Sequence, residues 1–360
     1  MPVMGADLAR GALMVGLLGP VEVGPVGGAM APVPQPQQRV LLGLLGVAGG
    51  RMVTAEALVD GLWGEEWSRE RARNVHTHVS ALRRLLAAAE PGRGGVRVVR
   101  SGGGYRLVAA EAEVDAGLFR FLAGQGREAS RAGDVTTAAG LFTQALGLWR
   151  GAALADVVGL CPRLVGDAAG LEEMRAGVVE ERLECDLVLG RHAEVAADGP
   201  GLVAAFPLRE RLAGQVMVAL YRCGRRGEAL AVYDTTRRVL AGQLGLDPGP
   251  ELAGLQAKVL ADDPSLAAPT PAEAATTDDP QAGAPAGAGK DRGYLEGPER
   301  IYQLAAPGLA EKFPPLKTAP APTSKSGLSL LELISISSHR STQSSVSHNT
   351  PRNCGAQRIE

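Results

Sequence analysis

The sequence predicts a mainly α protein, in which a small N-terminal unit mixes helices with short β hairpins and an all-helical domain follows. Three observations predict this architecture. Within the first 110 residues, three apolar stripes of helical period precede a glycine-centred hairpin. From about residue 114 to residue 263, helical segments follow one another between Gly and Pro breaks. Beyond Pro264 the composition turns to Ala, Pro, Gly, Thr and then Ser, which buries too little apolar surface to fold. We therefore expect domains at 14–110 and 111–264, and a disordered tail at 265–360.

The first half of the N-terminal domain is predicted to contain a strand, a loop or hairpin, and two helices. Residues 14–23 are expected to form a strand with a turn at Gly19-Pro20, and the Pro- and Gly-rich residues 24–36 a loop or edge hairpin. Helical periodicity begins at Gln37 and stops at Gly49-Gly50. Thr54 then offers an N-cap to a second helix, over residues 55–63.

A third helix is predicted from about Glu70 to Ala89, with Val75, Val79, Leu82 and Leu86 as its apolar stripe. After a break at residues 91–95, two short apolar-alternating segments flank Ser101–Gly104, which predicts a β hairpin. The order strand, helix, helix, helix, hairpin is that of a winged helix-turn-helix. Its third helix would be the recognition helix and its hairpin the wing.

The second domain carries a weak internal repeat. Gly133, Ala138 and Phe142 have the same spacing as Gly224, Ala229 and Tyr233, and Gly190 lies 34 residues before Gly224. That interval is the tetratricopeptide period, in which a turn glycine joins two helices and a small alanine lets them approach. We therefore expect a tetratricopeptide-like helical domain. Gly199-Pro200-Gly201 falls where the second helix of the middle repeat should continue, so a helix break is expected there.

The charges are segregated along the chain. Residues 1–110 carry twelve arginines against eight acidic residues, whereas residues 111–264 carry sixteen basic against twenty-two acidic ones. The stretch from Arg69 to Arg106 alone holds nine arginines and two glutamates. A concentrated basic segment beside an acidic domain is typical of a phosphate-binding module joined to a protein-binding module.

The candidate DNA-binding side chains lie on the third helix and on the hairpin. Arginine can pair with guanine and asparagine with adenine, while serine and threonine serve phosphates or thymine methyl groups. The helix is expected to contribute Arg73, Asn74, Thr77, Ser80, Arg83 and Arg84, and the wing Arg97, Arg100 and Arg106. A single arginine-bearing helix is usually only a solvated face. The neighbouring helices and the arginine-bearing hairpin favour the DNA-binding interpretation.

Residues 14–263 resemble the Streptomyces antibiotic regulatory protein family, which joins a winged helix of the OmpR response-regulator class to a bacterial transcriptional activation domain. The stretches that carry the resemblance in the first domain are Leu18–Val23, Gln38–Leu42, Glu56–Gly64, Thr77–Leu86 and Gly103–Leu107. In the second domain they are Leu148–Gly151, Leu171–Glu173, Asp186–His192, Pro207–Arg211, Ala219–Gly224 and Leu244–Leu252.

The resemblance implies a pathway-specific activator of a secondary-metabolite gene cluster. Such an activator binds direct repeats near a promoter, forms a homodimer on DNA and recruits RNA polymerase. It also implies that Thr77, Ser80, Arg83 and Arg84 lie on the recognition helix. The chain departs from the family at Ala81, where arginine is frequent, and in the 13 residues before Met14, which suggest Met14 as the first residue of the protein.

Other function classes find little support in the sequence. The four cysteines have no C-x-x-C spacing, and no apolar run reaches the length of a membrane span, so we expect a cytoplasmic protein with reduced thiols. His76 and His78 are two residues apart on a helix and cannot share a metal ion. The segment ending at Lys290 lacks the Gly and Ser/Thr positions of a phosphate loop. We expect no enzyme activity, cofactor or metal.

Two alternatives stay open. A repressor would use the same DNA chemistry, and sequence cannot separate the two signs of regulation. A helical-repeat adaptor whose winged helix binds protein instead of DNA belongs to another class, and its binding would not depend strongly on salt.

Overall fold

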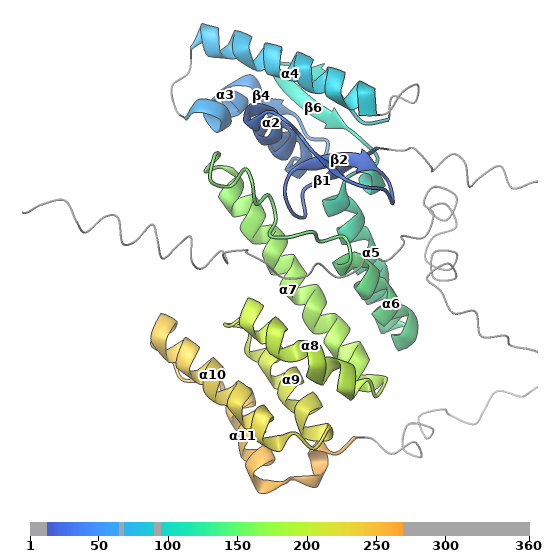
Figure 1. Ribbon diagram of the computed structural model, residues 1–360, viewed down its shortest axis with the longest axis vertical. Coiled ribbons are helices and arrows are strands. Elements are labelled where there is room, and N and C mark those ends of the chain that lie inside the picture. Colours follow the sequence, from blue (N-terminus) through green and yellow to red (C-terminus); the bar gives the residue numbers. More distant parts are fainter. Residues whose placement is uncertain (1–12, 65–67, 90–94, 269–360) are drawn as a thin grey trace, which may run out of the picture. The chain divides into compact units, whose positions relative to one another are not determined.

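The computed structural model describes residues 13–64, 68–89 and 95–268, except the side chain of Arg69. Within these residues the protein is mainly helical, with a winged helix followed by a helical domain (Figure 1). The predicted fold class is therefore confirmed. Of the tail expected to be disordered, residues 269–360 lie outside the described residues. At its start, Ser265 and Leu266 instead belong to a short 3₁₀ turn in which Leu266 is buried.

The chain begins with a small antiparallel sheet in the order β1-β2-β3. β1 (Leu13–Gly16) and β2 (Glu22–Pro25) pair with Val15 opposite Val23, and β3 (Ala31–Pro32) pairs with β2. The predicted turn at Gly19-Pro20 lies between β1 and β2. Residues 24–36 are expected to form a loop or an edge hairpin, and the pairing of β2 with β3 shows the hairpin.

Three helices and a second sheet form the rest of the winged helix. The helices are α2 (Pro36–Val47), α3 (Ala55–Trp63) and α4 (Arg69–Ala89). The backbone N–H of Ala57 donates to the Thr54 hydroxyl at 3.2 Å, which confirms the predicted N-cap. The sheet has the order β4-β6-β5, in which β4 (Val53–Thr54) and β5 (Arg97–Ser101) flank β6 (Gly104–Val108). Strands β5 and β6 are the predicted wing.

The helical domain consists of successive antiparallel helices. After the 3₁₀ turn η1 (Glu111–Glu113) they are α5 (Asp115–Arg131), α6 (Val135–Leu146), α7 (Leu164–Val188), α8 (His192–Ala205), α9 (Glu210–Arg222), α10 (Arg226–Leu244) and α11 (Pro250–Ala261). Gly133, Gly190 and Gly224 each adopt positive φ, of 82°, 75° and 73°, at the turn inside a helix pair. The predicted repeat therefore has a structural counterpart in three helix–turn–helix pairs.

The predicted break at Gly199-Pro200-Gly201 is wrong, because α8 continues through it. A proline in a helix removes the hydrogen bond to the carbonyl four residues earlier. Here that carbonyl, of Ala196, accepts a hydrogen bond from Arg225 Nη1 at 3.2 Å. In addition, a Cβ at Gly199 would lie 2.7 Å from the Val216 side chain, so this helix packs closely on α9. Tertiary contacts thus override the local propensity.

The apolar core is divided between two clusters that do not follow the predicted domain boundary. The first runs from Leu13 to Cys185 and includes the winged helix together with α5, α6 and most of α7. The second runs from Val179 to Leu266 and includes α8 to α11 and the 3₁₀ turn η2 (Pro264–Leu266). The winged helix therefore shares one core with the first half of the helical domain.

We expect Pro200→Ala to stabilise the protein, because alanine restores the missing backbone donor inside α8. Proline costs a helix interior about 3 kcal/mol relative to alanine, but Arg225 already supplies a donor to the Ala196 carbonyl, so the expected gain is only about 1–2 kcal/mol. Calorimetry should show a melting temperature several degrees higher. A melting temperature that is unchanged or lower would contradict this account of α8.

Candidate nucleic-acid interface

Helix α4, the predicted recognition helix, has an apolar face and a polar one. Val75, Val79, Leu82 and Leu86 are at most 2% exposed and hold the helix against the core. At about 100° per residue, the opposite face carries Arg73, Thr77 and Arg84. All three are exposed, as is Asn74 at the edge of that face. The helix therefore presents a continuous polar surface to solvent.

The two hydroxyls on α4 are tied to their own helix. Thr77 Oγ1 donates to the carbonyl of Arg73 at 3.4 Å, and Ser80 Oγ donates to the carbonyl of His76 at 2.9 Å. Their lone pairs remain available as acceptors. Ser80 is half-buried, whereas Thr77 is exposed, so Thr77 is the better placed of the two to reach a ligand on the polar face.

Arg83 points sideways toward the wing rather than straight out from α4. Its Nε donates to the carbonyl of Val98 in β5 at 2.7 Å, and its guanidinium lies 5.9 Å from the centre of the Tyr105 ring in β6. The hydroxyl of Tyr105 lies 3.3 Å from His76 Nδ1 on α4. These contacts join α4 to the hairpin, and we call the two together the reading head, after their predicted role.

The wing owes its shape to two glycines. Gly102 has a φ of +54° in the tip, a conformation that favours glycine. A Cβ at Gly104 would lie 2.0 Å from the carbonyl oxygen of Val53, so β4 could not pair with β6 if another residue stood there. The sequence anticipates the glycine tip but not this close approach.

The register of the hairpin places its arginines on two faces. Paired residues of antiparallel strands point to the same side, and side chains alternate along each strand. Arg100 pairs with Tyr105 and therefore shares the side that faces α4. Arg106 pairs with Val99, so Arg106 and Arg97 lie on the other side. All three are exposed. The register thus places Arg100 on the side of the wing that faces α4, and Arg97 and Arg106 on the opposite side.

Most of these cations are not neutralised by the protein. Within the described part of the chain, Arg73, Arg84, Arg100 and Arg106 form no ion pair, whereas the arginines of the helical domain largely do. An exposed guanidinium without a carboxylate beside it is free to bind phosphate or a base edge. That the nine predicted side chains of α4 and the wing contact DNA stays a prediction.

Sequence reasoning missed the contacts that lock the wing. Tyr105 lies on the inner side of the period-2 alternation of β6, which indicates burial but not the partner of its hydroxyl. His78 likewise packs its ring 6.1 Å from the ring of Trp63, which links α4 to α3. Both depend on how helices and strands meet in space. Among the described residues, no cluster of three or more His, Cys, Asp or Glu could hold a metal ion, and no helix combines the length and apolarity needed to cross a membrane.

Comparison with known families agrees with this geometry. Residues 34–107 match the model of the transcriptional regulatory protein C-terminal domain, and residues 114–260 match that of the bacterial transcriptional activator domain. The chain is 35% identical over 259 residues to the regulatory protein DnrI of Streptomyces peucetius, of which it covers 94%. The chain belongs to the Streptomyces antibiotic regulatory protein family.

Other relatives place the chain within a wider group. It is 44% identical over 266 residues to the regulatory protein AfsR of Streptomyces coelicolor, but spans only 26% of that longer protein. Among solved structures, EmbR of Mycobacterium tuberculosis in complex with a low affinity phosphopeptide superimposes with a TM-score of 0.63 at 31% identity. That match covers 70% of this chain and 66% of the EmbR chain.

We expect Arg83→Ala to loosen the wing without unfolding α4. The substitution removes the donor to Val98 and the contact with Tyr105, so the amides of β5 and β6 should exchange hydrogen faster. Arg84→Ala, which changes the neighbouring exposed side chain, is the control and should leave exchange unchanged. Equal protection of the hairpin in both variants would contradict the role of Arg83 in holding the wing.

Proposed function

We propose that the protein is a sequence-specific regulator of transcription that binds double-stranded DNA through α4 and the wing. One observation carries the proposal: Arg73, Thr77 and Arg84 form an exposed strip along the face of α4 that points away from the core. A helix of this kind fits the major groove of B-DNA, where it can reach base edges and the phosphates on both sides.

The side chains of α4 would have distinct roles. Arg73 and Arg84 would pair with guanine or with a phosphate, and Asn74 is suited to adenine. Thr77 and Ser80 would accept or donate hydrogen bonds to a phosphate, or contact a thymine methyl group. The terminal nitrogens of Arg83 would bind DNA, while its Nε donates to the carbonyl of Val98 in the wing. Ala81 offers only a methyl group, so this position would contribute less to base reading than an arginine does in many family members.

The wing would bind the flanking groove by both of its faces. Arg100 lies on the side that faces α4, and Arg97 and Arg106 lie on the other. A two-stranded ribbon that enters a minor groove has a phosphate backbone on each side, so arginines on opposite faces could contact opposite strands.

We further propose that the protein activates transcription from promoters of a secondary-metabolite gene cluster. Support comes from membership of the family and from the activator-domain match over residues 114–260. In this proposal two protomers bind direct repeats in the cytoplasm as a homodimer on DNA, and the helical domain offers a surface to RNA polymerase. Two linked weak sites would gain affinity through effective concentration.

Salt dependence separates a DNA-binding regulator from a protein-binding adaptor. The logarithm of the affinity for a selected duplex should fall steeply with the logarithm of the salt concentration, because each neutralised phosphate releases counterions. Arg84→Ala should weaken binding and reduce the slope by about one if Arg84 contacts a phosphate. Arg131→Ala, an exposed arginine on α5, is the matched control and should change neither quantity. A wild-type slope near zero would favour the adaptor.

Transcription in vitro decides between activator and repressor. Purified protein added to RNA polymerase and a template that carries the selected site should raise the yield of transcript several-fold, and the same template without the site should show no increase. A fall in transcript yield on the specific template would identify a repressor with the same mode of DNA binding.

A further inference from the structure

The loop between β1 and β2 has nearly all of its backbone polar groups satisfied by the helical domain. The carbonyls of Leu17, Leu18 and Gly19 accept hydrogen bonds from the backbone N–H groups of Leu154, Arg150 and Ala155, at 2.9, 2.8 and 3.3 Å. The N–H of Val21 donates to Asp156 Oδ1 at 2.8 Å. Buried backbone groups need such partners. The loop is therefore held by a segment more than 100 residues away in the sequence.

Asp115, the first residue of α5, holds the centre of this loop. Its Oδ1 accepts from the N–H of Leu17 at 2.7 Å, and its Oδ2 accepts from the N–H of Leu18 at 3.0 Å and from Arg150 Nη1 at 2.9 Å. The side chain is only 2% exposed. Burial raises the pKa of this carboxyl group, and Arg150 together with the two N–H groups offsets part of the rise. In all three hydrogen bonds the carboxyl oxygens are the acceptors, which is the role of an ionised carboxylate.

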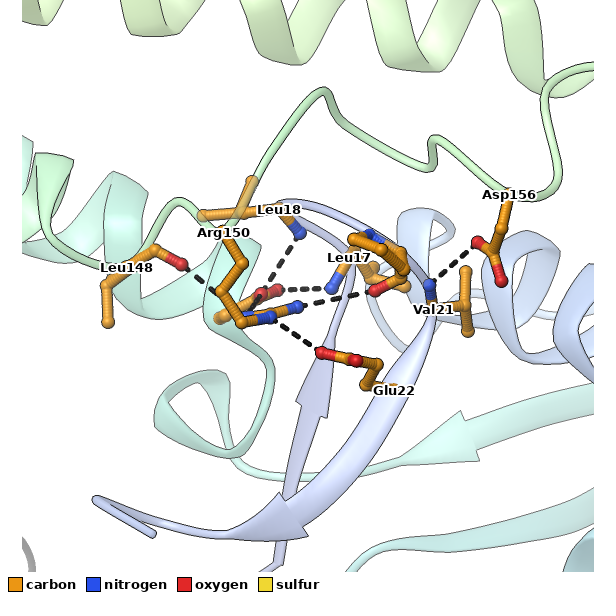
Figure 2. A network of polar contacts seen from close by, with 9 residues as sticks. Leu17, Leu18, Val21, Glu22, Leu148, Arg150 and Asp156 are labelled. Carbon is orange, nitrogen blue, oxygen red and sulfur yellow. Dashed lines mark hydrogen bonds and ion pairs between the residues drawn. The ribbon is translucent and has the colours of Figure 1, made fainter. Parts of the chain in front are cut away.

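Arg150 extends the contact from Asp115 to the first sheet. Figure 2 shows its guanidinium reaching Glu22 in β2, where Nε lies 3.0 Å from Glu22 Oε2. Its Nη2 also donates to the carbonyl of Pro20 at 3.4 Å. A Cβ at Gly16 would lie 2.2 Å from Nη2, so a side chain at this end of β1 would displace the guanidinium. One side chain therefore bridges α5, the loop and the sheet.

Apolar contacts surround these polar ones. Leu17, Leu18 and Val21 of the loop are fully buried, as are Leu154 and Val157 of the segment that faces them. Two outer ion pairs flank the contact: Arg39 of α2 with Asp156 at 3.0 Å, and Asp60 of α3 with Arg163 at 2.7 Å. All of these residues belong to the same compact unit of the chain.

We infer that Asp115 and Arg150 are positioning residues for DNA recognition, which hold the reading head and the helical domain as one rigid body. We call the loop Leu17–Val21 with these two side chains the loop clamp. The expected effect on DNA binding rests on the proposed function, whereas the expected rigidity does not. Asp115 is the buried member of the pair, so loss of Arg150 would leave its carboxylate buried without an opposite charge beside it.

Rigidity matters when two protomers occupy neighbouring half-sites. If the helical domains of the two protomers touch, a fixed orientation of each reading head keeps the second head near its half-site and raises its effective concentration. A loose connection spreads that head over many orientations and lowers this advantage. Affinity for an isolated half-site depends only on α4 and the wing, so it should hardly change.

Spin labels can measure the rigidity directly in the full chain. Cys223 is exposed and accepts one label, and Ala88→Cys, at an exposed position of α4, accepts the other. Cys354→Ser removes the remaining competing thiol, since Cys161 and Cys185 are buried. We expect a narrow distribution of distances between the labels in this background. Asp115→Asn, which preserves size but places an amide N–H₂ against donors, should broaden it. Asp167→Asn, at an exposed position of α7, is the control and should keep it narrow.

Binding to DNA supplies the second readout. Asp115→Asn should lower the affinity for a tandem site at least 10-fold and that for a single half-site less than 2-fold. If Asp115→Asn does not fold, Glu22→Gln, which removes only the charge of the partly buried second partner of Arg150, should show the same selective loss to a smaller degree. A narrow distance distribution in both variants would overturn the inference, as would equal losses on tandem and single sites. If the wild-type protein binds no duplex, the proposed function fails while the distance measurement still decides the clamp.

Discussion

The fold of this chain depends on how a buried carboxylate is satisfied. Asp115 loses almost all contact with water, and an ion in that position is tolerated only with several donors around it. Two backbone N–H groups and one guanidinium provide them. Because those donors come from the loop after β1 and from Arg150, the carboxylate fixes two distant parts of the chain at one point. Loss of any one donor would leave the buried carboxylate with only two hydrogen bonds.

The candidate interface is held in shape by its own packing. Strand β2 of the first sheet contacts α4, and the apolar stripe of α4 lies in the core of the winged helix. Arg83 then holds the wing against α4 through the carbonyl of Val98. The exposed arginines therefore stand on a scaffold with few degrees of freedom. Such preorganisation reduces the entropy lost on binding and favours selective recognition of a ligand.

The sequence predicts the parts of this structure that repeat locally. The stripe of α4, the N-cap at Thr54 and the glycine turns of the repeats each depend on residues a few positions apart. What it cannot predict are contacts between distant residues: Asp115 lies 98 positions from Leu17, and no spacing rule joins them. The same holds for Pro200, whose helix survives because Arg225 supplies the missing donor.

At the candidate interface, too, the sequence predicts local features and misses contacts between distant residues. Periodicity correctly places Arg73, Thr77 and Arg84 on the exposed face of α4, because burial of one face decides the other. It does not reveal that Arg83 turns toward the wing, since this depends on the position of β5. Strand alternation alone would separate Arg97 from Arg100, but the side on which each lies relative to α4 follows only from the pairing with β6.

Photocrosslinking would test most directly whether the exposed face of α4 reads DNA. Benzoylphenylalanine placed at Thr77 should form a covalent adduct with a duplex selected by the protein from a random pool, and the adduct should map to bases within the selected motif. The same group at Ala257, an exposed position of α11, should give none. Adducts from position 257 but not from position 77, or equal adduct formation with unselected DNA, would contradict the account.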